Sequence, residues 1–189
     1  LRDADHYLLI HTSDVHPWPP PLFQIPTTVQ AQLPLRERVT EADHPIASPY
    51  MQPSPVNHRI FWQSIRDTDR ALSTLFSYLE EQYAPEDYIV NLYSDHGVSI
   101  FSTLQDIVGT GLTHAAWMMR GVGVPEGVRT NELTSAVDIY PALAHLLDFP
   151  VGSNVDGILP KILGGTGRDI TYSNSLYPGK PYFLAARSR

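Results

Sequence analysis

The stretch Tyr88-Ile89-Val90-Asn91-Leu92-Tyr93-Ser94-Asp95-His96-Gly97 has an apolar half followed by a polar half. A short run of branched and aromatic residues is typical of a buried strand, so the first half predicts a strand over 88–93. The polar half then lies at the carboxyl end of this strand, the edge where open α/β sheets bind ligands. We therefore expect Asp95 and His96 to face a crevice at that edge.

The segments around this strand alternate between helix-like and strand-like patterns. Apolar residues spaced by three and four predict a helix over 57–83, and a second stripe predicts a helix over 135–147. Short apolar runs predict further strands at 6–11, 115–119, 170–173 and 182–186. Alternation of this kind predicts an α/β fold with helices flanking a predominantly parallel or mixed central sheet.

The chain is long enough to enclose one hydrophobic core, so we expect a single domain over 1–189. Prolines recur from Pro17 to Pro55, and each lacks an amide donor, which predicts a long loop over 17–56 near the mouth of the site. Residues 150–189 are rich in Gly and Pro and form a tail that contains the last two predicted strands.

Composition excludes several kinds of site and partner. Cysteine is absent, so any metal must be bound by oxygen and imidazole ligands rather than thiolates. The formal net charge is −7 and no cluster of Lys and Arg occurs, which argues against nucleic acid and anionic membranes as partners. No apolar run approaches the roughly 20 residues of a transmembrane helix, and the first residues do not resemble a signal peptide. The lack of an initiator Met suggests a processed or excised product, and the compartment stays open.

Asp95 and His96 place a carboxylate beside an imidazole, and this combination suits a divalent cation. Gly97 follows them and allows the backbone to turn sharply or to approach a ligand closely. Asp-His pairs also occur as turn formers and as surface groups with satisfied hydrogen bonds. The tetrapeptide alone therefore leaves both interpretations open.

Other histidines follow or precede predicted strands. His11, Asp14 and His16 come after the first predicted strand, where they suit either a ligand set or a polar loop with an Asx-type turn. His114 precedes the strand at 115–119, and its spacing favours a histidine at the edge of the core that is bonded to the backbone. The Gly-rich run 164–167 precedes a predicted strand rather than a helix, which favours a flexible turn over a phosphate loop.

Taken in sequence order, several blocks resemble the latter part of a sulfatase, a family of the alkaline phosphatase superfamily. The blocks are 8–17, the helix with Ile65, Asp69 and Leu72, the strand and turn at 88–97, and the closing segments 120–127, 137–141 and 156–160. The resemblance covers most of the chain. It implies an alkaline phosphatase-like fold, of which this chain is a partial domain.

The resemblance also implies a metal-dependent sulfuric ester hydrolase and the roles of its residues. Asp95 and His96 would bind the cation, for which calcium is the first choice and manganese, magnesium and zinc are alternatives. His16 would contact the sulfate group or protonate the leaving oxygen. His114 would take the place of the anion-binding lysine of the family, because no lysine lies between Asp95 and Lys161. The substrate would be a sulfate or phosphate ester.

Two features of the family are not found in this sequence. Sulfatases make a formylglycine nucleophile within a Cys/Ser-x-Pro-x-Arg motif and use a further pair of aspartate ligands, and neither is recognisable here. The chain would then carry half of the metal site, need the remainder of the parent domain as its partner, and be inactive alone. A phosphodiesterase, phosphatase or phospho-group transferase of the same superfamily is the alternative enzyme. A pseudoenzyme or structural fragment is the alternative outside enzymes.

Overall fold

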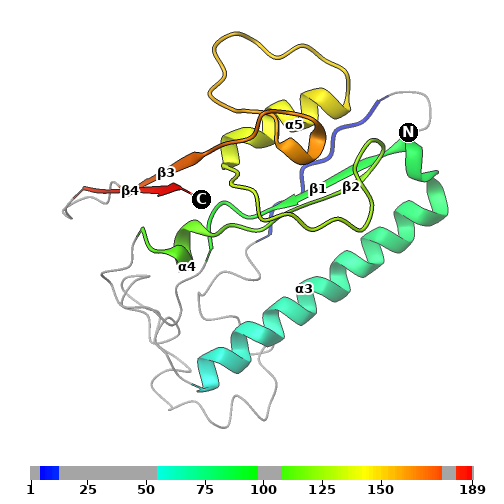
Figure 1. Ribbon diagram of the computed structural model, residues 1–189. Coiled ribbons are helices and arrows are strands. Elements are labelled where there is room, and N and C mark those ends of the chain that lie inside the picture. The colour runs from blue at the N-terminus through cyan, green and yellow to red at the C-terminus, as the bar shows by residue number, and fades with distance from the viewer. Residues whose placement is uncertain (1–4, 13–54, 98–107, 176–181, 189) are drawn as a thin grey trace. The chain divides into compact units, whose positions relative to one another are not determined.

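The computed structural model describes the chain in four stretches (Figure 1), which are residues 5–12, 55–97, 108–175 and 182–188. Contacts divide the chain into two compact units, of which the first holds Leu1–Ser77 with Ile100–Ser102 and the second holds Tyr78–Ser99 with Thr103–Arg189. The expected loop over 17–56 lies outside the described residues except at its end. The single-domain organisation over 1–189 stays a prediction.

The longest element is helix α3, Pro55–Gln82, which confirms the helix predicted over 57–83. Gln63 Nε2 and Arg70 Nη1 donate to Asp67 Oδ1 at 2.9 and 3.3 Å, so this carboxylate links neighbouring turns on the exposed surface of the helix. The helix ends before Pro85, which begins a short 3-10 helix, η4, over Pro85–Asp87. A proline is a common stop signal because it cannot continue the helical hydrogen bonds.

Strands β1, Ile89–Tyr93, and β2, Trp117–Gly121, form a two-stranded antiparallel sheet in the second unit (Figure 1). They confirm the strands predicted at 88–93 and 115–119, with the second strand shifted toward the C-terminus. The predicted burial is not found, because the residues of both strands are half-buried or exposed. Trp117 Nε1 donates to Asn91 Oδ1 at 2.7 Å across the sheet. This hydrogen bond gives the indole nitrogen a partner at a half-buried position, as amphipathic aromatic residues require.

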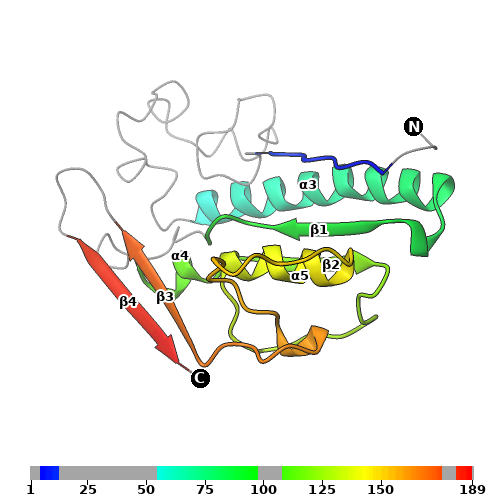
Figure 2. The same ribbon diagram turned by 90° about the horizontal axis from the view of Figure 1, so that it is seen from above.

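A second antiparallel pair is formed by β3, Ile170–Ser175, and β4, Phe183–Ser188, whose arrows point in opposite directions in Figure 2. They confirm the two strands predicted in the C-terminal tail. No parallel pair occurs among the strands of the described stretches. The mixture of helices and strands in the predicted α/β class is therefore confirmed, whereas the larger central sheet stays a prediction.

Residues 6–11, predicted to form a buried strand, do not form one in this structure. Their large apolar side chains are exposed, with exposed fractions of 84% for Tyr7, 75% for Leu8 and 61% for Ile10. A strand needs a neighbour to satisfy its backbone groups, and this segment has no strand partner within the described part of the chain. The prediction of a buried strand is wrong here because the apolar pattern alone does not supply the pairing.

The best-buried part of the second unit surrounds α5, Ile139–Leu146, and the 3-10 turn η6, Ala136–Asp138, that leads into it. Together these elements confirm the helix predicted over 135–147, with its first turn in the tighter 3-10 form. Asp138 is only 1% exposed, and its carboxylate accepts a hydrogen bond from Ser135 N at 2.8 Å. Ser135 and Asp138 form a capping box, which satisfies amides at the start of the helical segment.

Arg168 neutralises the buried carboxylate of Asp138. Its Nε and Nη2 atoms donate to Asp138 at 2.6 to 2.8 Å, and Nη2 also donates to the carbonyl of Asp156 at 2.6 Å. The hydrogen bonds to Asp138 raise the pKa of Arg168, while burial acts in the opposite direction. Ile158 N completes the set by donating to Asp138 Oδ1 at 2.7 Å. The carboxylate therefore joins the start of α5 to two loops.

The run 164–167, expected to be a flexible turn, is fixed by backbone hydrogen bonds. Gly165 N donates to Pro160 O at 3.0 Å, and Gly167 N donates to Leu159 O at 3.1 Å. These bonds place Arg168 directly after an ordered turn, which brings its guanidinium to Asp138. The run is a turn, as predicted, and its conformation is set by the segment that precedes it.

We expect the change Asp138→Ala to destabilise the second unit by about 3 to 5 kcal/mol, the usual cost of removing one partner of a buried ion pair. The loss leaves the Arg168 charge unpaired and removes the acceptor of two backbone amides. Urea unfolding followed by circular dichroism measures the change. Glu80→Ala is the control, because Glu80 belongs to the same unit and its pair with Arg120 is exposed, so the pair should contribute less than about 1 kcal/mol. Similar losses for both variants would contradict the structural role of Asp138.

Candidate functional site

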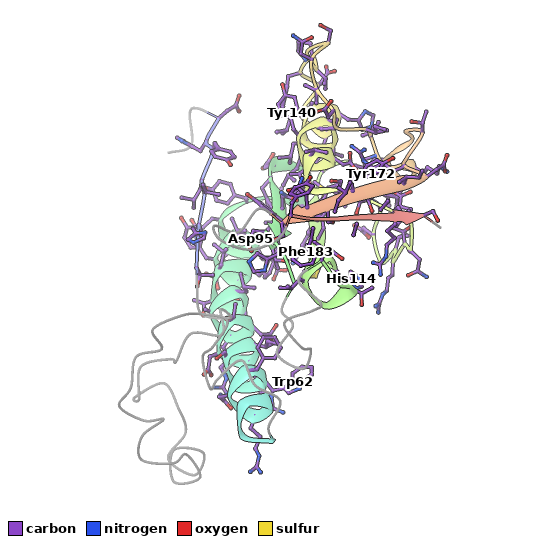
Figure 3. The ribbon with its side chains drawn as sticks, turned by 90° about the vertical axis from the view of Figure 1, so that its left-hand side faces the viewer. Trp62, Asp95, His114, Tyr140, Tyr172 and Phe183 are labelled. Carbon is purple, nitrogen blue, oxygen red and sulfur yellow. The ribbon has the colours of Figure 1, made fainter. Side chains whose placement is uncertain are left out.

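Asp95, which is labelled in Figure 3, and His96 lie directly after β1, where the chain leaves the sheet. Their side chains are 83% and 49% exposed. Asp95 Oδ1 accepts a hydrogen bond from His96 N at 2.9 Å, and Asp95 Oδ2 lies 3.5 Å from His96 Nε2. The structure thus brings the two predicted ligands together with their polar atoms adjacent.

The imidazole of His96 is oriented by the next residue. His96 Nδ1 lies 2.7 Å from the carbonyl oxygen of Gly97, and a proton on Nδ1 makes this a hydrogen bond that leaves the Nε2 lone pair available. Metal-binding histidines are commonly held in this way, with one ring nitrogen on a backbone carbonyl and the other on the metal. Ligand atoms that share one cation lie about 3 to 4 Å apart, given ordinary ligand distances. The 3.5 Å separation from Asp95 Oδ2 fits two neighbouring positions on one cation.

The same geometry allows a weaker interaction without a metal. With His96 protonated, Asp95 and His96 form an ion pair at 3.5 Å. Both side chains are largely exposed, and exposed ion pairs contribute about 0 to 1 kcal/mol to stability. An ion pair of this kind therefore contributes little to the stability of the fold.

At Gly97 the backbone of the turn closely approaches the segment that forms helix α4, Thr110–Thr113. Gly97 N donates to Leu112 O at 2.7 Å. A Cβ atom at position 97 would lie 2.2 Å from Gly111 O and 2.8 Å from His114 O, so only glycine fits without a shift of backbone. The sequence predicted a sharp turn or a close approach at this glycine, and the structure shows the close approach.

His114 ends α4, and its backbone N donates to Thr110 O at 3.0 Å. Its side chain is exposed rather than buried at the edge of the core, and Figure 3 shows it beside α4. The structure brings the segment of His114 against the Asp95–His96 turn through the hydrogen bond of Gly97. A role for the His114 imidazole itself stays a prediction.

The remaining histidine of the predicted site is not covered by the structure. His16 and Asp14 lie outside the described residues, so the predicted role of His16 stays a prediction. His11 is described and exposed, and it belongs to the first unit. Across the described stretches, no group of three or more His, Cys, Asp or Glu side chains suits a metal ion. Asp95 and His96 are the predicted metal ligands that the described stretches contain, and their role as ligands stays a prediction.

Sequence reasoning missed the part played by Ser94. Ser94 N donates to Ala116 O at 3.0 Å, and Ala116 N donates to Ser94 Oγ at 2.8 Å. The sequence signal that could have indicated this role was a serine at the end of the predicted strand, immediately before Asp95 and His96. The partner, which lies 22 residues further along the chain, has no signal in the local pattern.

Known proteins match this chain over much of its length. The family model described as Sulfatase matches residues 1–149. The Sulf-1 homolog of Caenorhabditis elegans is 28% identical over 107 residues, which cover 53% of this chain and 15% of that protein. Arylsulfatase K of Gallus gallus is 27% identical over 108 residues, which cover 54% of this chain and 20% of that protein. The matching part thus spans a fifth or less of these relatives.

No solved structure matches the chain. Among the helices of the described stretches, none combines the length and the apolar character needed to cross a membrane.

Proposed function

The chain belongs to the sulfatase family, and from this premise we propose that it is part of a metal-dependent hydrolase of sulfuric esters. The observation that carries the metal site is the 3.5 Å approach of Asp95 Oδ2 to His96 Nε2 at the end of β1. In this proposal the two side chains bind a divalent cation, with calcium as the first choice and manganese, magnesium and zinc as alternatives. An alkaline phosphatase-like central sheet would extend the β1–β2 pair.

Each candidate residue has its own role in the proposed site. A divalent cation, when bound, polarises the ester and neutralises the charge that develops during hydrolysis. Asp95 supplies an anionic oxygen of the kind that hard cations prefer, and His96 supplies a neutral nitrogen whose ring is held by Gly97 O. His114 and His16 are proposed to contact the transferred anion or to protonate the leaving oxygen, which an imidazole can do near neutral pH.

The nucleophile and further ligands are proposed to come from another part of the same domain. The sequence has no Cys and no Cys/Ser-x-Pro-x-Arg motif from which formylglycine could be made. Burial supports an incomplete domain, because Ala142 and Ala144 are the buried hydrophobic residues among those described, while Tyr172 is 65% and Leu184 is 61% exposed. A two-stranded sheet is also only marginally stable by itself. Additional protein would cover these surfaces and complete the site.

The test is hydrolysis by the complete gene product that contains this chain. We expect it to hydrolyse an aryl sulfate faster than the matching aryl phosphate, to lose activity after chelation, and to regain activity best with calcium. Mass spectrometry of its peptides should find formylglycine. Faster hydrolysis of the phosphate ester by a protein with a Thr or Ser nucleophile would favour the phosphoesterase alternative. Hydrolysis of neither ester with any of the four metals would favour the pseudoenzyme.

A further inference from the structure

The hydrogen bonds between β1 and β2 continue for one residue pair beyond the strands, and one of the two bonds of this pair uses a side chain. Tyr93 is paired with Trp117, so the next positions in register are Ser94 and Ala116. Ser94 N donates to Ala116 O at 3.0 Å, as a regular antiparallel ladder requires. The return bond is different, because Ala116 N donates to the hydroxyl Oγ of Ser94 at 2.8 Å. The side chain of Ser94 therefore takes the place that its own carbonyl oxygen has in a regular pair.

This substitution lets the chain leave the sheet without losing the partner strand. The carbonyl of Ser94 is released from the ladder, so the backbone can turn away at Asp95. Three residues after Ser94, Gly97 N donates to Leu112 O at 2.7 Å. This hydrogen bond holds the other end of the turn against the segment that contains Leu112. Two attachments, Ser94 to Ala116 and Gly97 to Leu112, therefore hold the turn against its neighbour.

Three of the candidate site residues, which are Asp95, His96 and His114, lie between these two attachments. On the first segment, Asp95 and His96 lie between Ser94 and Gly97. On the second segment, His114 lies between the two attached residues, two positions from each. The attachments therefore fix how the Asp95–His96 turn and the His114 segment sit against each other.

We propose that Ser94 is a positioning residue of the site, whose hydroxyl fixes the Asp95–His96 turn against the segment that carries His114. This inference rests on the proposed function. Serine and threonine carry an oxygen on Cβ and can accept from Ala116 N, whereas alanine cannot. Displacing catalytic groups by about 1 Å can lower rates about 100-fold, and loss of a side chain that orients a metal ligand commonly lowers metal affinity or activity 10- to 100-fold.

The experiment compares Ser94→Ala and Ser94→Thr in the complete protein. We expect Ser94→Ala to weaken calcium affinity about tenfold by titration calorimetry and to lower kcat by about the same factor, while KM changes less than about twofold. Ser94→Thr should restore both values because it keeps the acceptor. Hydrogen exchange of the Ala116 amide should be faster in Ser94→Ala than in Ser94→Thr.

Thr130→Ala is the matched control, because Thr130 Oγ1 also accepts a backbone amide, Glu132 N at 3.1 Å, but in an exposed segment that contains none of the candidate site residues. It should leave calcium affinity and kcat unchanged. An active wild type whose Ser94→Ala variant binds calcium and turns over like wild type would overturn the inference alone. Equal losses in folded Ser94→Ala and Ser94→Thr would also overturn it. A wild type that neither hydrolyses an ester nor binds a cation would instead contradict the proposed function.

Discussion

Asp95→Ala in the complete protein is expected to lower kcat/KM for an aryl sulfate by about 10³-fold or more. A metal ion contributes several kcal/mol of charge stabilisation to ester hydrolysis, and each tenfold in rate corresponds to about 1.4 kcal/mol. Asp95 is the anionic member of the candidate pair, with its Oδ2 atom 3.5 Å from His96 Nε2. Removing the carboxylate should therefore weaken cation binding and hydrolysis together.

Asp95→Asn separates the charge of the carboxylate from its role in the turn. Asparagine keeps an oxygen that can accept from His96 N, as Asp95 Oδ1 does at 2.9 Å, but it removes the negative charge. We expect Asp95→Asn to fold like wild type and still to lose most of the calcium affinity. Glu86→Ala removes an exposed carboxylate from η4 in the same unit and should keep the wild-type kcat/KM. Steady-state kinetics and calcium titration check these expectations, and wild-type kinetics in Asp95→Ala would remove Asp95 from the site.

The local sequence pattern was sufficient to predict those elements whose formation depends on their own residues. The stripe that predicted α3 reflects the period of a helix, and the apolar runs that predicted β1 and β2 reflect the residue types that strands favour. The adjacency of Asp95 and His96 is likewise local, since two consecutive residues after a strand need no distant partner to lie side by side. Gly97 could also be recognised, because a glycine after polar residues at a strand end commonly marks a close approach.

Contacts between distant residues could not be predicted in the same way. Arg168 pairs with Asp138 across 30 residues, and an arginine after a Gly-rich run gives no local sign of this partner. The segment 6–11 shows the converse, since its apolar pattern predicts a buried strand, whereas it forms no strand and has no strand partner in the described part of the chain. The hydrogen bond of Ser94 Oγ depends on Ala116, a residue with no polar side chain at all. In each case the deciding group belongs to a segment that only the folded chain brings near.

The last prediction concerns the 189-residue chain on its own, which we expect to be catalytically silent and to bind calcium weakly. Asp95 and His96 supply two ligands, whereas calcium takes about six to eight oxygen ligands, so water would fill most of its coordination sphere. Hard cations gain affinity chiefly from fixed anionic oxygens, and one carboxylate is not enough. Hydrolysis in addition needs nucleophile, cation and anion-binding groups fixed in one geometry.

The comparison is between this chain and the complete gene product, each assayed with aryl sulfate and aryl phosphate in calcium, magnesium, manganese and zinc. We expect turnover and tight calcium binding in the complete protein and neither in the chain alone. The chain carrying Asp95→Ala is the control, because it should be indistinguishable from the unmodified chain in turnover. Robust hydrolysis by the 189 residues that disappears in Asp95→Ala would show that the chain holds a whole site. The first candidates for the further ligands would then be His16 and Asp14, which lie outside the residues that the structure describes.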